Sequence, residues 1–388
     1  MDSATSAPLG GDAPGSAPDD GPVAGQRSSL GPRGLLLAVS AFVTILLTAF
    51  AGLLPVPFVA LSPGPVTDVI AGSGEGEDPA TGLIRIEGAP TYPTQGRLDL
   101  TTVSLRGGPG RDMTLVELLL DWRDGDVAVL PRGLYFRADT TQQQADAESA
   151  AEMTGSQESA KVAALTELGI DVPATTTRCV ASVYADVPAA DVLRVGDEIT
   201  AVDGVDVPDF AALQTAIRAL PEDAPVTLGV LRGGKPVTVT TRTVSSGGTT
   251  AIGIVPVVEY DLPFSIDIDL DDVGGPSAGT MFALGIVDEL TPGAMTGDEH
   301  VAGTGSITAD GTVGPIGGLR QKVVGSQEAG ARWFLAPREE CGQVAGATPD
   351  GITVVPITTL HDAVQAVTAI GEGTGDALTT CDEVAAAD

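Results

Sequence analysis

The chain has 388 residues, and 43% of them are apolar, so it is long enough for about two or three domains with a buried core. Acidic residues outnumber basic ones by 52 to 20, which gives a formal net charge of −32. Binding to a phosphate backbone requires Lys and Arg to replace counterions, so we expect no nucleic-acid partner. The two histidines and three cysteines lack zinc-site spacing, and we expect neither a metal nor a cofactor.

An uncharged apolar run near the N-terminus predicts a membrane segment. Residues 35–54 are twenty consecutive uncharged residues, which matches the length that crosses a ~30 Å hydrocarbon layer as a helix. Arg27 and Arg33 precede this run, whereas the next basic residue is Arg85. The positive-inside rule therefore predicts a single-pass protein of the cell membrane with a cytoplasmic N-terminus and an extracytoplasmic bulk. A cleaved signal peptide is the alternative, because Ala49-Phe50-Ala51 fits a cleavage site.

Two regions flank this apolar run. Residues 1–34 are rich in Gly, Pro, Ser, Ala and Asp, which predicts a disordered cytoplasmic tail. Residues 55–174 contain short β-type runs and helical patterns, which predict an extracytoplasmic α/β and helical region. The predicted strands are 83–87, 98–105 and 127–130, and the predicted helices are 115–122 and 140–169.

Residues 175–248 alternate β-type runs with one helical run. The expected strands are 178–183, 198–202, 226–231 and 237–241, and the expected helix is 210–220. The run Val187–Ala190, followed by Leu193–Ile199 and Val202-Asp203-Gly204, resembles the second half of a PDZ domain. PDZ domains bind extended peptides by adding a strand to a sheet edge, so the resemblance implies docking of polypeptide substrates. No GLGF-type loop precedes Arg178, which leaves the capture of free C-termini open.

The same region contains a pattern that imitates a phosphate-binding loop. Gly229 to Lys235 fits the spacing GxxxxGK, but Pro236 occupies the position of the metal-binding Ser or Thr. β-type runs on both sides favour a hairpin turn at Gly233-Gly234. We therefore expect no nucleotide binding.

Ser277 lies where a predicted strand meets a predicted helix. The alternating run 264–270 predicts a half-buried strand, and the apolar run 280–290 predicts a helix. Between them lies Gly275-Pro276-Ser277-Ala278-Gly279, whose small residues allow close approach of a substrate and whose N–H groups at the helix start favour a negative charge. This is the local chemistry of an oxyanion hole with Ser277 as nucleophile. A simple N-cap serine is the alternative.

A second cluster follows with a specific spacing. It consists of Gly303-Thr304-Gly305-Ser306-Ile307, a turn at Asp310-Gly311, and the segment from Pro315 to Lys322. Together with GGPSAG around Ser277, this cluster resembles the proteolytic domain of Lon proteases over residues 251–371. The resemblance implies that Ser277 is the nucleophile, that Lys322 is its base, and that the hydroxyl of Thr304 holds the lysine amine. Gly275 departs from the family, which commonly has Asp there.

The whole chain is similar to bacterial membrane-anchored serine peptidases with PDZ and Lon domains. This resemblance implies an α+β protein that cleaves extracytoplasmic polypeptides without ATP, and it is compatible with an oligomer. The expected domains are a tail (1–34), a transmembrane helix (35–54), an α/β and helical region (55–174), a PDZ-like domain (175–248), a Lon-like proteolytic domain (249–371) and a C-terminal tail (372–388).

The proposed base requires an unusual environment for its amine. A free lysine has a pKa near ~10.4, so about one side chain in two thousand is neutral at pH 7. To accept the serine proton, Lys322 needs a pKa near ~7–8, which burial in an apolar pocket produces. Ile316, Leu319 and Val323 are the apolar neighbours in the sequence that supply such cover.

Two other functions fit parts of the sequence. Gly275 to Gly279 also matches GxSxG, the nucleophile elbow of α/β-hydrolases, for which His361 is the histidine in the right chain order. A PDZ scaffold with an inactive Lon-like domain is the non-enzymatic alternative.

In an oxidising compartment we expect Cys341 and Cys381 to form a disulfide and Cys179 to be a buried free thiol.

Overall fold

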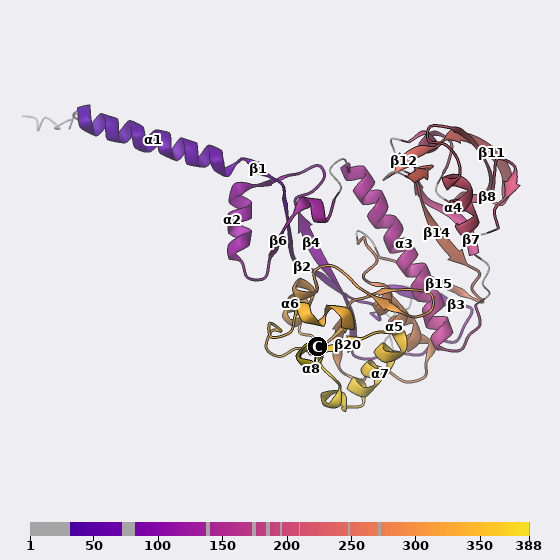
Figure 1. Ribbon diagram of the computed structural model, residues 1–388. Coiled ribbons are helices and arrows are strands. Elements are labelled where there is room, and N and C mark those ends of the chain that lie inside the picture. Colours follow the sequence, from indigo (N-terminus) through magenta and orange to yellow (C-terminus); the bar gives the residue numbers. More distant parts are fainter. Residues whose placement is uncertain are drawn as a thin grey trace, which may run out of the picture. The chain divides into compact units, whose positions relative to one another are not determined.

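The computed structural model describes residues 32–71, 82–136, 140–172, 176–183, 187–194, 196–208, 210–246, 249–270 and 273–387 (Figure 1). The chain divides into two units, residues 1–52 and residues 53–388. Residues 1–31 of the predicted tail lie outside the described residues.

Helix α1 (Pro32–Gly52) is the described part of the first unit. Its 21 residues are exposed or nearly so, and the mean hydropathy of its most apolar stretch is 2.3. This length and composition are compatible with a membrane anchor, although a signal sequence shares both properties.

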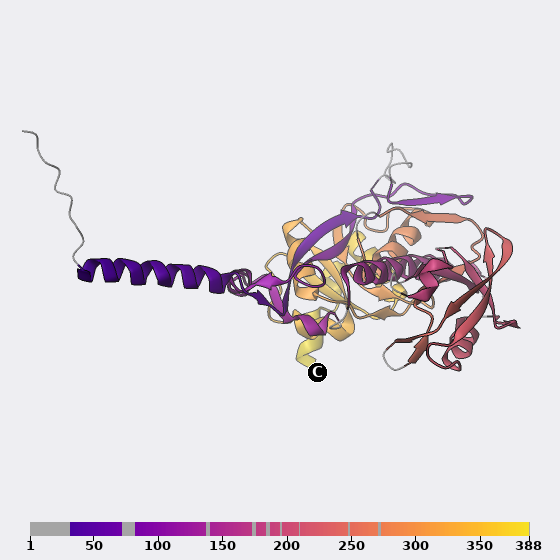
Figure 2. The same cartoon turned by 90° about the horizontal axis from the view of Figure 1, so that it is seen from above.

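The second unit is built on a mixed six-stranded sheet (Figures 1 and 2). Its strands β16, β19, β20 and β4 run parallel, whereas β2 is antiparallel to both β4 and β6. In spatial order the strands are β20 (Thr353–Ile357), β19 (Trp333–Pro337), β16 (His300–Gly303), β4 (Arg97–Arg106), β2 (Phe58–Asp68) and β6 (Ala128–Pro131).

This sheet crosses a boundary that the sequence suggested. Residues 55–174 and 249–371 were expected to be separate regions, but β2, β4 and β6 come from the first and β16, β19 and β20 from the second. Strand β3 (Ile84–Glu87) likewise pairs with β15 (Ser265–Ile268). Local periodicity identifies a strand but not the strand beside it, so these long-range pairings left no signal in the sequence.

Helices pack around the sheet to form the main core. Helix α5 (Gly279–Leu290) is buried along all but its last residue, and α3 (Gln142–Glu167) packs beside it. Helix α3 starts with a capping box at Thr141 and ends before Gly169, which adopts a φ of 71°. Helices α6 (Leu319–Glu328) and α7 (Leu360–Gly371) complete this group.

A short segment follows α1 in the chain. Strand β1 (Pro55–Val56) pairs with β5 (Met113–Thr114), and α2 (Leu115–Arg123) begins directly afterwards. Thr114 and Glu117 form a capping box that fixes the start of α2.

The PDZ-like region forms a second sheet with the path β11-β10-β8-β7-β14. The predicted turn at Gly233-Gly234 joins β10 to β11, and the positive φ angles of these two glycines, 56° and 72°, suit a tight hairpin. Strand β14 pairs with β7, so this sheet extends beyond the expected boundary at residue 248. The elements are β7 (Thr176–Val183), β8 (Glu198–Val202), β9 (Val205–Asp206), α4 (Phe210–Arg218), β10 (Pro225–Arg232), β11 (Lys235–Arg242) and β14 (Ile254–Tyr260), with the β12 (Val244–Ser246) and β13 (Thr249–Ala251) pair beside them.

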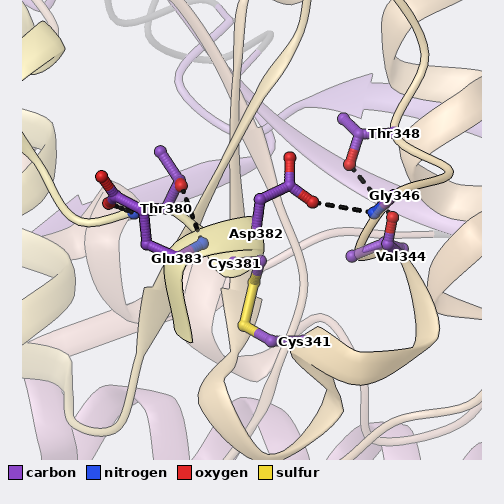
Figure 3. Close-up of a disulfide and its surroundings, with 8 residues drawn as sticks. All are labelled: Cys341, Val344, Gly346, Thr348, Thr380, Cys381, Asp382 and Glu383. Atoms are coloured by element: carbon purple, nitrogen blue, oxygen red, sulfur yellow. Dashed lines mark hydrogen bonds between the residues drawn. A yellow bond between two sulfur atoms is a disulfide. The ribbon is translucent and has the colours of Figure 1, made fainter. Parts of the chain in front are cut away.

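The described part of the C-terminal segment, expected as a tail over residues 372–388, folds back against β20 and the turn around Cys341. Residues 375–377 form a 3₁₀ turn, and α8 (Cys381–Ala387) follows it. A disulfide joins Cys381 to Cys341, and the carboxylate of Asp382 accepts a hydrogen bond of 2.9 Å from the N–H of Gly346 (Figure 3). The side chain of Cys179 lies outside the described residues.

Candidate active site

The structure brings together the three side chains to which the sequence assigned catalytic roles. Lys322 Nζ lies 2.8 Å from Ser277 Oγ and donates a hydrogen bond of 2.9 Å to Thr304 Oγ1. The hydroxyl of Thr304 in turn donates to the carbonyl oxygen of Ser277 at 3.0 Å. Thr304 therefore fixes the lysine amine and the backbone of Ser277 at the same time.

Ser277 lies in the turn that opens α5. Gly275 has a φ of 85°, a left-handed conformation that favours glycine, and Ala278 caps the helix. The N–H of Gly305 donates to the carbonyl of Ser277 at 2.9 Å, and the carbonyl of Gly305 accepts from Thr280 N–H at 3.0 Å. The loop that contains Thr304 is thus bound to the serine turn at Ser277 itself and at Thr280.

Helix α3 holds the same turn from another direction. Ser156 Oγ donates a hydrogen bond of 2.9 Å to the carbonyl of Pro276, directly before Ser277. The carbonyl of Ser149 accepts from the N–H of Gly275 at 2.9 Å. Neither serine is predictable from the sequence as part of the site, because both lie in a helix without a motif, far from Ser277 in the chain.

Lys322 lies on the first turn of α6 and is almost completely buried, with 1% of its surface exposed. Burial lowers the pKa of its amine to about 7, because a charged ammonium is disfavoured away from water. The neighbouring residues Leu319 and Val323 are fully buried, and Ile316 is partly buried. The amine is therefore neutral in a large fraction of molecules near neutral pH.

Glu340 acts on Lys322 in the opposite direction. Its carboxylate favours the ammonium form and so raises the pKa of Lys322, but this effect is smaller than that of burial. Burial also raises the pKa of Glu340 itself. Its oxygens accept hydrogen bonds of 3.1 Å from Ile316 N–H and from Gln343 Nε2. The sequence analysis assigned no role to this residue, which directly precedes Cys341.

A cavity of about 550 Å³ opens at the two catalytic candidates. Among the described residues that line it, the phenol of Tyr135 is the one ionisable group besides Lys322. Within the described part of the chain, no group accepts a hydrogen bond from the N–H of Ser277 or of Ala278. The lining residues are Leu61, Pro65, 101–105, Tyr135, Met153, 273–278, 315–317 and Lys322.

His361 does not take part in this arrangement. Its Nδ1 lies 2.8 Å from Glu167, its Nε2 lies 2.9 Å from Gln365, and the ring is exposed. The carboxylate of Glu167 raises the pKa of His361. Lys322 rather than His361 contacts Ser277 Oγ, so the structure contradicts the alternative in which His361 is the base.

Comparisons with known proteins identify two regions of the chain. Residues 272–369 match the family model of the Lon protease (S16) C-terminal proteolytic domain, and residues 166–243 match the PDZ domain model. The chain is 31% identical to the Lon protease of Azospirillum brasilense over 121 residues, which are 30% of this chain and 15% of that protein. It is 40% identical to Lon protease 1 of Herpetosiphon aurantiacus over 90 residues, which are 23% of this chain and 11% of that protein.

Among solved structures, the crystal structure of the PDZ domain of the SdrC-like protein from Listeria monocytogenes is 31% identical to this chain, with a TM-score of 0.21. The match covers 22% of this chain and 93% of that one. The proteolytic-domain match supports a serine peptidase. The chain therefore combines a PDZ domain with a Lon-type C-terminal proteolytic domain.

Proposed function

We propose that the chain is a membrane-anchored serine endopeptidase that works without ATP and uses Ser277 and Lys322 as a catalytic dyad. The observation that carries this proposal is the 2.8 Å contact between Lys322 Nζ and Ser277 Oγ in the wall of the cavity. A buried amine with a pKa of about 7 is a suitable general base near neutral pH.

In the first half of the reaction, Ser277 Oγ attacks the carbonyl carbon of the scissile peptide bond, and its proton moves to the neutral amine of Lys322. The π electrons of the carbonyl move to oxygen, and the N–H groups of Ser277 and Ala278 stabilise the resulting oxyanion. The tetrahedral intermediate then collapses. The C–N bond breaks, the ammonium of Lys322 gives its proton to the leaving amine, and an ester remains on Ser277.

In the second half, a water molecule attacks the ester carbonyl and gives its proton to Lys322. The C–O bond to Ser277 breaks, the serine oxygen takes the proton back from Lys322, and a carboxylic acid product leaves. Thr304 keeps the amine in place through both halves, because its hydroxyl accepts from the amine and donates to the backbone of Ser277.

The substrates that we propose are extracytoplasmic polypeptides. The apolar length of α1 and the arginines before it support an anchor with the bulk of the chain outside the cytoplasm. The PDZ domain supports docking of an extended polypeptide segment beside the cleavage site.

The dyad is tested by casein and peptide cleavage with the purified full-length chain in mild detergent. We expect Ser277→Ala to lower kcat by about 10³-fold or more, as for the loss of a nucleophile. Ser265→Ala is the matched control, because Ser265 is exposed, bonds to Asp267 and does not line the cavity. Unchanged cleavage in Ser277→Ala would reject Ser277 as the nucleophile.

The topology is tested by adding protease to intact cells without their wall. Digestion of residues 55–388, with protection of an epitope placed before Arg27, is the expected result. Protection of the bulk of the chain would mean that the active site faces the cytoplasm.

A further inference from the structure

Helix α2 has an unusual distribution of side chains. Its buried residue is a charged one, Asp121, which forms an ion pair of 2.7 Å with Arg106. Leu115 and Leu118 are half-buried, but the other four large apolar residues face outward: Val116, Leu119, Leu120 and Trp122 are 46%, 54%, 66% and 76% exposed. A helix that packs only against its own domain directs its apolar stripe toward the core, so this exposed α2 patch requires an external partner.

The position of α2 in the chain identifies that partner. Helix α1 ends at Gly52, and the carbonyl of Leu54 accepts a hydrogen bond of 3.0 Å from the N–H of Leu115, the first residue of α2. The antiparallel pairing of 55–56 with 113–114 continues this connection. The start of α2 is therefore bonded to the second residue after α1, close along the chain to any bilayer that α1 crosses.

The chemistry of the α2 patch also suits a lipid surface. Tryptophan and leucine are the side chains that enter the boundary between headgroups and acyl chains, and interfacial helices place basic residues beside them. Arg123 is exposed at the end of α2, next to Trp122, while Asp124 and Asp126 follow the helix. Leu53 and Leu54 add exposed apolar surface at the same junction, with exposures of 68% and 45%.

We propose that the α2 patch inserts into the interface of the bilayer that α1 crosses and forms a second membrane contact of the proteolytic region. This inference rests on the proposed membrane anchoring. With α1 and the α2 patch both in contact with the membrane, the proteolytic region is held at the lipid surface and is not attached through α1 alone.

The two tryptophans of the chain make the contact measurable. Trp122 is exposed, Trp333 is buried in the core, and α1 contains no tryptophan. The full-length chain is reconstituted into vesicles of phosphatidylcholine and phosphatidylglycerol, and only vesicles that float in a density gradient are analysed. Lipids brominated near the headgroup end of the acyl chain then quench tryptophans that touch them.

We expect brominated lipid to quench the emission of the wild type, and to leave Trp122→Phe, which retains Trp333, unquenched. At full quenching of Trp122, the wild type should lose the fraction of its tryptophan emission that Trp122 contributes. This fraction is measured as the emission that is missing from Trp122→Phe in unbrominated lipid. Leu120→Glu should reduce the quenching, because a carboxylate does not enter the interface. Val205→Glu is the matched control, since Val205 is 68% exposed in the PDZ-like region. Brominated lipid should quench the emission of this variant as strongly as that of the wild type.

Three outcomes would overturn the inference. Quenching of Trp122 by acrylamide but not by brominated lipid would place the patch in water. Protection of Trp122 from both quenchers would indicate a protein partner, such as a second copy of the chain. Failure of the chain to float with the vesicles would contradict the membrane anchoring itself. Flotation without quenching of Trp122 by lipid would contradict only the contact of α2.

Discussion

At the scale of single residues, the buried amine of Lys322 links catalysis to stability. The native state lowers its pKa to about 7 from an ordinary value of 10.5. Between these two pH values the unfolded chain binds a proton that the native chain does not bind, so this group makes the protein less stable as the pH falls from 10.5 to 7. Below pH 7 both the native and the unfolded state bind the proton, so the decrease in stability levels off.

Replacing Lys322 with Met should therefore abolish cleavage but stabilise the fold near neutral pH. Over two pH units a single such proton changes the free energy of unfolding by about 3 kcal/mol. We expect the stability difference between Lys322→Met and the wild type to grow by about this amount from pH 9 to pH 7. Urea unfolding in mild detergent measures it, with the exposed Lys235→Met as control. A difference that does not change with pH would show that the pKa of Lys322 is not lowered in the native state.

At the scale of structural elements, helix α3 supports the turn that contains Ser277, the proposed nucleophile. The sequence predicts a helix over residues 140–169, because apolar residues such as Val162 and Leu165 repeat along it and Gly169 ends it. It did not predict that Ser156 on this helix would hold the carbonyl of Pro276. A contact between residues so distant in the chain depends on tertiary packing, which local periodicity does not encode.

We expect Ser156→Ala to lower kcat by about tenfold, because misplacing a reacting atom by a fraction of an ångström weakens catalysis. The lost hydrogen bond should lower the free energy of unfolding by about 1–2 kcal/mol. Thr154→Ala is the matched control, since the Thr154 hydroxyl bonds within α3 to the carbonyl of Ala150 and faces away from the turn. An equal loss of kcat in both variants would indicate a general effect on the helix.

The disulfide ties α8 to the segment that holds Glu340. Cys341 and Cys381 are 40 positions apart in the chain, and closing a loop of about this size contributes about 3–4 kcal/mol on the chain-entropy estimate. Cys381→Ser should lower the free energy of unfolding by about this amount, whereas Cys179→Ser should leave the bridge intact. Peptide mapping without a reducing agent identifies the bonded pair. A bridge that contains Cys179 would contradict the pairing.

At the scale of the whole molecule, local patterns predicted the elements better than their assembly. The hairpin at Gly233-Gly234, helix α5 after Ser277 and the strand expected over residues 226–231 all lie where the sequence placed them. The joining of β4 to β16 in one sheet, and of β14 to the PDZ-like sheet, depends on pairing between distant segments. Residues 55–174, which the sequence analysis set apart, therefore contribute strands to the same sheet as residues 249–371.

The same contrast holds for the candidate site. Ser277, Thr304 and Lys322 were identified because they lie in motifs with a specific order and spacing. Ser156 and Glu340 were not identified, because each acts through a neighbour that only the folded chain brings close. Glu340 in particular is a carboxylate that sequence alone would place on the surface, as most carboxylates are.

The pH dependence of kcat/KM tests the central claim, that Lys322 is the base for Ser277. Peptide cleavage by the full-length chain over about pH 6 to 10 should rise through one ionisation near the pKa of Lys322, about 7. Lys322→Arg should be inactive, because a guanidinium cannot give up its proton in a protein and so cannot serve as base. His361→Ala should keep the wild-type profile. Full activity in Lys322→Arg, or loss confined to His361→Ala, would contradict the dyad.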